Sequence, residues 1–259
     1  MIPKIIHYCW LSGDEYPDLV KKCLHSWKEK LPGFEFRLWD RACLPVIGSQ
    51  FANEAFDAKL YAPAADVVRL WAVYHYGGFY LDTDVEVIKD LSPLTAFPYV
   101  LGLENGTGKI EAAVFGAEPG MEYLGQCLAF FDDKHCVRDG KRSASFPLPG
   151  VMSHVMGKEM RIIRSLEEFD RESPLFQIFN WDYLSPKSFM ASERKGRKAI
   201  TKNTFTFHHF RVAWLPFHKK LSVYLRRILG TRASELFFSI WRIIRKPRKD
   251  LLVSKDVES

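Results

Sequence analysis

The sequence predicts an α/β fold in which a mainly parallel sheet is flanked by helices, and three observations support this prediction. Short apolar runs such as IIHYCW (5–10) are typical of strands buried on both faces, as in a parallel sheet. Segments with apolar residues at helical spacing lie between these runs, and such alternation favours a parallel sheet. The chain has 259 residues, 47% of them hydrophobic, which is enough for one large domain with a substantial core.

The first part of the chain predicts a strand, a helix and a second strand. We expect a buried strand over residues 4–10. A helix then begins after Pro17 and ends at Pro32-Gly33, because proline and glycine terminate helices. Residues 34–40 (FEFRLWD) alternate apolar and polar side chains, which is typical of a strand.

The middle of the chain contains the clearest elements. A helix is expected over residues 61–76, with Pro63 near its first turn and Gly77-Gly78 after its last. The run FYLDTDVEVI (79–88) that follows is the strongest strand signal in the sequence. Further strands are expected over residues 99–104 and 112–117, and a further helix over residues 121–131.

Carboxylates gather on the strand expected over residues 79–88. Because side chains alternate along a strand, Asp82, Asp84 and Glu86 should point to one side and their apolar neighbours into the core. Clustered carboxylates repel one another unless a cation neutralises them, and oxygen ligands suit Mg²⁺ or Mn²⁺. A Mg²⁺ ion often completes its shell with substrate phosphates, so this pattern suits a diphosphate leaving group. The alternative is a set of acids that face solvent at a strand end.

The preceding helix adds Asp66 and Arg69, which are three residues apart and therefore on one side of it. An arginine can bind phosphate or pair with an acid. The alternative is a simple ion pair within the helix.

With these residues identified, the sequence resembles glycosyltransferase family 32, which includes bacterial capsule and exopolysaccharide transferases and yeast mannosyltransferases. The run APAADVVRLWAVYHYGGFYLDTDVEVIKDL looks like the sugar-binding DXD region of that family. Other family segments are matched in the same order along the chain, from residue 2 to about residue 216: IPKIIHYCWLSG, SWKEKLPGFEFRLWD, LPGVM and NTFTFHHFRVAWLP.

The resemblance implies a GT-A nucleotide-sugar-binding fold, which is Rossmann-like, over residues 1–216. It also implies a nucleotide-sugar donor, a divalent metal (Mn²⁺ or Mg²⁺) and retention of the anomeric configuration. By position, Trp10 would stack on the donor base. Asp66 and Arg69 would hold the donor sugar and diphosphate, and Tyr80 would belong to the same donor site.

The metal site implied by the resemblance starts from the DXD motif. Asp82 would contact the ribose and the metal, and Asp84 would bind the metal directly. His208 or His209 would complete the site from the C-terminal side, and the sequence does not distinguish them. Trp214 would close over the diphosphate.

Three positions qualify this picture. The family often has serine where this chain has Ala65 and Ala213, so the hydroxyl that would help the metal or diphosphate is missing at Ala213. Glu104, in the loop GLENG, is a candidate carboxylate near the sugar. Its alternative role is that of a solvated loop acid.

The composition changes after Trp214, and we expect a second segment over residues 217–259. Within residues 219–249 many Lys and Arg residues are interleaved with two apolar stripes, as in basic amphipathic helices that lie on membrane interfaces. The alternative is a pair of helices packed on the catalytic domain. The stripes comprise Leu221, Leu225, Ile228 and Leu229, and then Leu236, Phe237, Ile240, Trp241 and Ile244.

Charge and cysteine usage bear on location. The net charge of +6 suggests an anionic partner, and the excess lies at the C-terminus. The cysteine count, five, is odd, and no CxxC pair is present, which favours a reducing compartment. No signal peptide or spanning segment is evident. We therefore expect a cytoplasmic protein, peripheral on the inner face of the cell membrane.

The predicted function is transfer of a hexose from a UDP- or GDP-sugar to a saccharide or lipid-linked saccharide acceptor in surface polysaccharide synthesis. One alternative is a haloacid-dehalogenase-like phosphatase, with Asp132-Asp133 as its second acidic pair. Another is a degenerate, non-enzymatic transferase-fold scaffold. Nucleic-acid binding is disfavoured, because the basic tail is too apolar and no recognition motif is visible.

Overall fold

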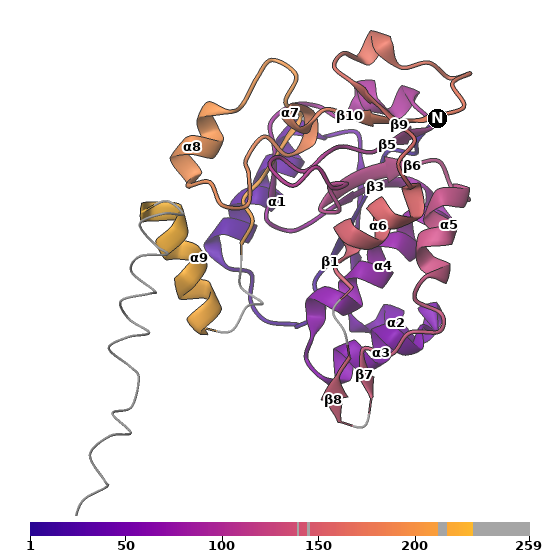
Figure 1. Ribbon diagram of the computed structural model, residues 1–259, viewed down its shortest axis with the longest axis vertical. Coiled ribbons are helices and arrows are strands. Elements are labelled where there is room, and N and C mark those ends of the chain that lie inside the picture. Colours follow the sequence, from indigo (N-terminus) through magenta and orange to yellow (C-terminus); the bar gives the residue numbers. More distant parts are fainter. Residues whose placement is uncertain (139, 144–145, 212–216, 230–259) are drawn as a thin grey trace, which may run out of the picture. The chain divides into compact units, whose positions relative to one another are not determined.

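The computed structural model describes residues 1–138, 140–143, 146–211 and 217–229 (Figure 1). The chain divides into two compact units, Met1–Trp214 and Leu215–Ser259. The boundary predicted after residue 216 adjoins residues outside the described ranges and stays a prediction.

A five-stranded sheet in the order β2-β1-β3-β6-β5 forms the centre of the first unit (Figure 1). β1 pairs in parallel with both β2 and β3, whereas β6 runs antiparallel to β3 and β5. All strands of this sheet except β6 therefore share one direction. The predicted α/β class, with a mainly parallel sheet between helices, is confirmed. The sheet strands are β1 (Ile5–Cys9), β2 (Glu35–Trp39), β3 (Gly78–Leu81), β5 (Tyr99–Val100) and β6 (Val114–Ala117).

Helices cover both faces of this sheet. Along β3, Phe79 and Leu81 belong to a hydrophobic cluster that also contains Trp27 of α1, while Tyr80 belongs to a second cluster with residues of α4, α5 and α6. Because side chains alternate along a strand, the two faces of β3 contribute to two different hydrophobic clusters. The longer helices are α1 (Asp18–Lys30), α3 (Gln50–Asp57), α4 (Tyr61–Tyr76), α5 (Glu122–Ala129), α6 (Leu148–Met156) and α9 (Phe217–Leu229).

Shorter elements complete the described chain. Three pairs of strands lie outside the central sheet: β4 (Val85–Val87) with β11 (Thr206–His208), β7 (Val137–Arg138) with β8 (Lys141–Arg142), and β9 (Met160–Ile163) with β10 (Phe176–Phe179). The short helices are α2 (Leu44–Ile47), α7 (Trp181–Leu184) and α8 (Glu193–Lys198), and the 3-10 turns are Arg41–Cys43, Ser92–Ala96 and Leu166–Glu168.

Two glycines allow β3 to lie beside β1. Gly77 and Gly78 have φ values of +63° and +97°, a region that L side chains rarely adopt. A Cβ on Gly78 would lie 2.7 Å from the carbonyl oxygen of Ile5 in β1. The glycine pair expected to end the helix over residues 61–76 therefore also permits the close approach of the following strand.

The single strand predicted over residues 79–88 is wrong. The chain forms β3, then a turn over Asp82–Asp84, and then β4, which pairs antiparallel with β11 instead of continuing in the central sheet. The amide of Val85 donates to the carbonyl of Asp82 at 2.9 Å, which closes the turn. Alternation along one strand consequently does not apply, and Glu86 does not join Asp82 and Asp84. The strand predicted over residues 99–104 is also shorter, and only Tyr99–Val100 is regular.

The second unit is described only through α9, where Leu221, Tyr224 and Ile228 are exposed at 46%, 48% and 78%. Their spacing of three and four residues places them along one stripe of the helix. The second predicted stripe, over residues 236–244, lies outside the described residues. None of the helices that the structure describes is both long enough and apolar enough to cross a bilayer.

Candidate active site

A cavity of about 670 Å³ opens at the edge of the sheet where β1 and β3 end. In α/β sheets, ligands bind in the crevice beyond the carboxyl ends of the strands. The antiparallel β6 begins at this same edge, so the residues just before it also reach the cavity. The polar and aromatic lining includes Trp10, Asp66, Arg69, Tyr80, Asp82, Asp84, Glu104, Glu111, Arg142, His208, Phe210 and Arg211.

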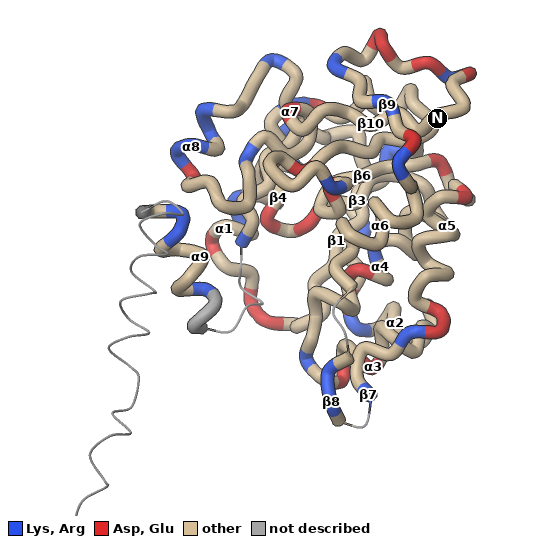
Figure 2. Tube along the Cα trace, in the orientation of Figure 1, with Lys and Arg blue, Asp and Glu red and all other residues tan. Residues whose placement is uncertain are grey.

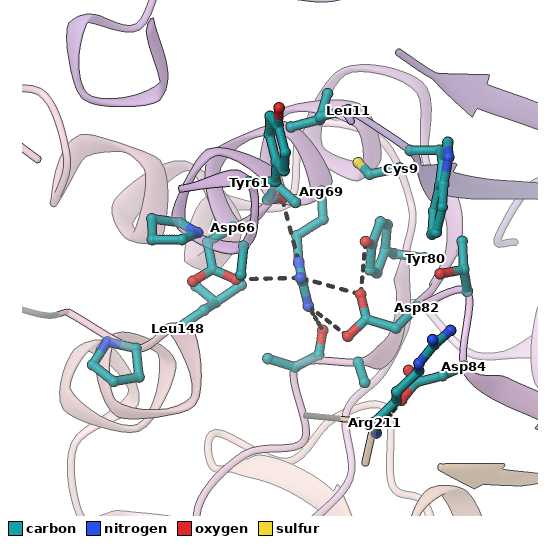
Figure 3. A pocket seen from close by; sticks show the side chains of 18 of the residues that line it. Cys9, Leu11, Tyr61, Asp66, Arg69, Tyr80, Asp82, Asp84, Leu148 and Arg211 are labelled. Carbon is teal, nitrogen blue, oxygen red and sulfur yellow. Dashed lines mark hydrogen bonds and ion pairs between the residues drawn. The ribbon is translucent and has the colours of Figure 1, made fainter. Parts of the chain in front are cut away.

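Arg69 of α4 links the helix to the DXD turn (Figure 3). Its Nη2 lies 3.1 Å from Asp82 Oδ1, and its Nη1 lies 3.3 Å from Asp82 Oδ2. The same guanidinium lies 3.3 Å from Asp66 Oδ1 and donates to the carbonyl of Ala112 at 2.8 Å. The Tyr80 hydroxyl donates to Asp82 Oδ1 at 2.8 Å. Asp82 is therefore held from two sides by α4 and β3.

Asp66 is a partly buried acid beside the start of α6. Burial raises the pKa of its carboxyl to about 7, although the charge of Arg69 and a hydrogen bond from the Leu148 amide act in the opposite direction. This carboxyl can therefore hold a proton near neutral pH.

Asp84 is held by backbone from the C-terminal side of the site. Its Oδ2 accepts from the amide of Arg211 at 2.6 Å, and its carbonyl accepts from the amide of His209 at 3.1 Å. Between these donors, Phe210 has a φ of +52°, which is unusual for a bulky residue. Burial opposes ionisation of Asp84, but the charge of His208 holds the pKa of this carboxyl below its usual range.

His208 lies between two acids. Its Nε2 is 3.5 Å from Asp84 Oδ1, its Nδ1 is 3.5 Å from Glu111 Oε2, and its ring stacks on Phe210 with centroids 3.8 Å apart. Burial would lower the pKa of the imidazole, but the two carboxylates raise it to about 10. One ligand atom from each of Asp82, Asp84 and His208 lies within 4.8 Å of the others, a grouping that could hold a metal ion.

His209 does not join this group. Its Nε2 lies 3.0 Å from Glu86 Oε2 and its Nδ1 lies 3.1 Å from Glu193 Oε1, so both ring nitrogens face a second cluster. Glu86 also pairs with Arg197, and the hydrogen bond from His209 is the main reason why the pKa of Glu86 falls to about 2. Of the two histidines that the sequence left open, His208 is the one that lies beside the DXD turn.

The remaining predicted residues fall into two groups. Trp10 lines the cavity, donates from Nε1 to the carbonyl of Asp14 at 2.6 Å, and packs edge-to-face on Tyr16. Glu104 also lines it and accepts from the Thr107 hydroxyl at 2.8 Å, and burial, together with the charge of Glu111, raises the pKa of Glu104. Ala213 and Trp214 lie outside the described residues.

The structure adds cavity residues that the sequence reasoning missed, among them Glu111, Arg142 and Arg211. An acid within the apolar run IEAAVFGA was a visible signal for Glu111, because a charged residue is rarely buried without a partner. Arg142 belongs to the β7–β8 hairpin, whose basic residues are blue in Figure 2. Arg211 directly follows the residues HHF (208–210), and only this position in the sequence could have suggested it.

Comparison with known proteins finds relatives of the region that carries the DXD turn. Residues 17–101 match a family described as "Glycosyltransferase sugar-binding region containing DXD motif", and the predicted resemblance is confirmed. The chain is 33% identical over 131 residues to inositol phosphoceramide mannosyltransferase 3 of Schizosaccharomyces pombe, covering 49% of this chain and 36% of that protein. It is 30% identical over 123 residues to the mannosyl phosphorylinositol ceramide synthase SUR1 of Saccharomyces cerevisiae, covering 46% and 32%.

The chain thus spans about a third of the length of these curated relatives. Among solved structures, it is similar to the galactosyltransferase LgtC in complex with donor and acceptor sugar analogues. That likeness has 12% identity and a TM-score of 0.44, and it covers 91% of this chain and 94% of the other.

Proposed function

We propose that this chain, which carries a DXD glycosyltransferase region related to that of yeast mannosyltransferases, transfers a hexose from a UDP- or GDP-sugar to a saccharide hydroxyl. The observation that supports this most is the grouping of Asp82, Asp84 and His208 inside one cavity. A volume of about 670 Å³ falls within the range of small-molecule sites. The proposal includes retention of configuration and a role in surface polysaccharide synthesis.

The three candidate ligands, Asp82, Asp84 and His208, fit a divalent cation. Carboxylate oxygens suit Mg²⁺ and Mn²⁺, and an added imidazole nitrogen favours Mn²⁺ between the two. Asp84 is suited to bind a cation because the pKa of its carboxyl is lowered, which favours the charged form. A cation at His208 Nε2 would replace the proton on that nitrogen. When bound, such a cation would offset the negative charge that develops on the departing diphosphate.

The arginines that line the cavity are assigned to different roles. Arg69 is occupied by Asp66, Asp82 and the Ala112 carbonyl, so we assign it to holding Asp82 in position. Arg142 and Arg211 also line the cavity and are the side chains we assign to the diphosphate. Trp10, at the end of β1, offers a flat apolar ring on which the donor base can stack.

The sugar would react through an oxocarbenium-like centre at its anomeric carbon. Retention then needs either front-face attack guided by the leaving phosphate or a protein carboxylate that forms a covalent intermediate. Glu104 is the cavity carboxylate that we consider for the second route, and its contact with Thr107 occupies one of its oxygens. We favour the front-face route.

We further propose a lipid-linked acceptor at an anionic membrane, on the inner face of the cell membrane. The relatives named above include an inositol phosphoceramide mannosyltransferase, whose name specifies a lipid acceptor. In α9, the exposed stripe of Leu221, Tyr224 and Ile228 is accompanied by basic residues in the last turn. This combination suits a helix that lies in a membrane interface.

The two alternative functions receive less support. A haloacid-dehalogenase-like site needs its second acidic pair near the first, but neither Asp132 nor Asp133 lines the cavity, and the Asp133 side chain is 78% exposed beside Lys134. A degenerate scaffold would have no need of the DXD turn and His208 grouped in one cavity. Both alternatives remain distinguishable by activity.

The decisive experiment measures nucleotide release from a panel of UDP- and GDP-sugars with Mn²⁺, for the wild type and Asp84→Ala. We expect release from one donor that disappears in EDTA and in the variant. Release of phosphate from a simple phosphoester would instead support the phosphatase. Donor binding without any turnover, including with candidate acceptors, would support the scaffold.

A further inference from the structure

Glu111 is a buried acid whose placement the donor site described above does not require. It lies just before β6, with 3% of the residue exposed. Its amide donates to the carbonyl of Gly102 at 2.8 Å, and its Oε1 accepts from the amide of Ala113 at 2.9 Å. Both the backbone and one carboxylate oxygen are therefore fixed, and the second oxygen takes no part in these contacts.

That second oxygen, Oε2, faces the imidazole of His208. Oε2 lies 3.5 Å from His208 Nδ1, close enough for an ion pair but beyond a good hydrogen bond. Among the described residues, both atoms are buried and neither has a hydrogen-bond partner. Buried polar atoms without partners are costly, so two such atoms that face each other define a hydrogen bond that a small shift of the ring would complete.

The other nitrogen of His208 points to the DXD turn. Nε2 lies 3.5 Å from Asp84 Oδ1 and belongs to the group of ligand atoms with Asp82 and Asp84. An imidazole can ligate a cation through Nε2 only when its remaining proton is on Nδ1. Histidine ligands commonly donate that proton to a carboxylate, which fixes both the tautomer and the ring orientation.

We propose that Glu111 is a positioning residue that accepts the Nδ1 proton of His208 and so presents Nε2 to a divalent cation. This inference rests on the proposed metal-dependent transfer. It differs from the catalytic candidates because Glu111 acts through His208. This role accounts for the burial of the Glu111 carboxylate beside His208.

The variant Glu111→Gln tests this with almost no change in volume. The amide of Ala113 needs an acceptor, so the glutamine oxygen should take the place of Oε1 and its NH₂ group should face His208 Nδ1. That arrangement favours the His208 tautomer that carries its proton on Nε2, and this tautomer cannot bind a cation through Nε2. Glu111→Asp provides a second test, because it keeps the charge but withdraws the oxygen from Nδ1.

The experiment measures binding of Mn²⁺ alone to the full chain, with water-proton relaxation as the readout. We expect both Glu111 variants to bind Mn²⁺ about 10- to 100-fold more weakly than the wild type, as for other partners of histidine ligands. Glu104→Gln is the matched control, since Glu104 lines the same cavity but hydrogen-bonds to Thr107 instead of pairing with a nitrogen of His208, and it should weaken binding much less. In a His208→Asn background, Glu111→Gln should cause no further loss.

Three outcomes would overturn the inference: wild-type affinity in both Glu111 variants, an equal loss in Glu104→Gln, or an additional loss in the double variant. Thermal unfolding in EDTA reports separately whether each variant is folded. A wild type that binds no Mn²⁺ would overturn the metal site and, with it, both proposals. Normal wild-type binding with unaffected Glu111 variants would overturn only the role of Glu111.

Discussion

Arg69 and Asp82 meet through two nitrogen–oxygen contacts of 3.1 and 3.3 Å, although one belongs to α4 and the other to the turn after β3. A planar guanidinium matches a carboxylate in this two-point geometry, whereas an ammonium does not. Asp82 is thereby fixed in direction as well as in charge. This pairing leads to the first prediction.

The variant Arg69→Lys should keep the positive charge and lose the two-point contact. We expect turnover to fall by roughly a hundredfold, because small misplacement of a group at the reacting centre is that costly. Steady-state nucleotide release measures it. Arg37→Lys, which changes a surface pair with Glu35, serves as the control and should leave the rate unchanged. A fall of similar size in both variants would contradict the assigned role.

The partly buried Asp66 should make stability depend on pH. Its pKa rises from 3.8 to about 7 on folding, because burial disfavours the charged form. The folded state therefore binds more protons than the unfolded state between these values, and stability should fall as the pH rises from about 4 to about 7. Chemical unfolding of the wild type and Asp66→Asn at pH 5 and pH 8 tests this. The variant should lose less stability than the wild type over that interval, and an identical pH dependence would be evidence against the shift.

Glu104→Gln separates the two routes to retention. If the leaving phosphate guides a front-face attack, the variant should lose less than about tenfold in turnover, which corresponds to about 1.4 kcal/mol. Burst kinetics with the preferred donor would reveal any covalent intermediate. A loss of several orders of magnitude, together with a trapped glycosyl-enzyme in other variants, would instead assign Glu104 as the nucleophile.

Membrane contact by α9 predicts flotation with liposomes that contain anionic lipid. The double variant Leu221→Asp with Ile228→Asp should remain at the bottom of the gradient, because it places charges on the exposed apolar stripe. Val46→Asp alters a residue of the first unit that is 71% exposed and should float like the wild type. A wild type that fails to float would refute the contact.

Local sequence pattern was sufficient for the elements that depend on near neighbours. The helix over residues 61–76 was predicted with the bounds that α4 shows, because helical spacing, an early proline and a terminal glycine pair act within a few residues. The acids of the DXD motif could also be recognised, since their type and spacing carry the chemistry. The turn at Asp82–Asp84 was missed, because an apolar run does not reveal that the chain leaves one sheet for another.

The sequence by itself determined the α/β class and identified the residues Asp66, Arg69, Asp82 and Asp84, which line the cavity. Only the tertiary structure distinguished His208 from His209. His208 is the last residue of β11, which pairs with β4 in the register that sets His208 opposite Val85, whereas His209 follows the strand. That register, like the approach of Glu111 to His208, depends on pairing between segments far apart in the chain, which no local pattern encodes.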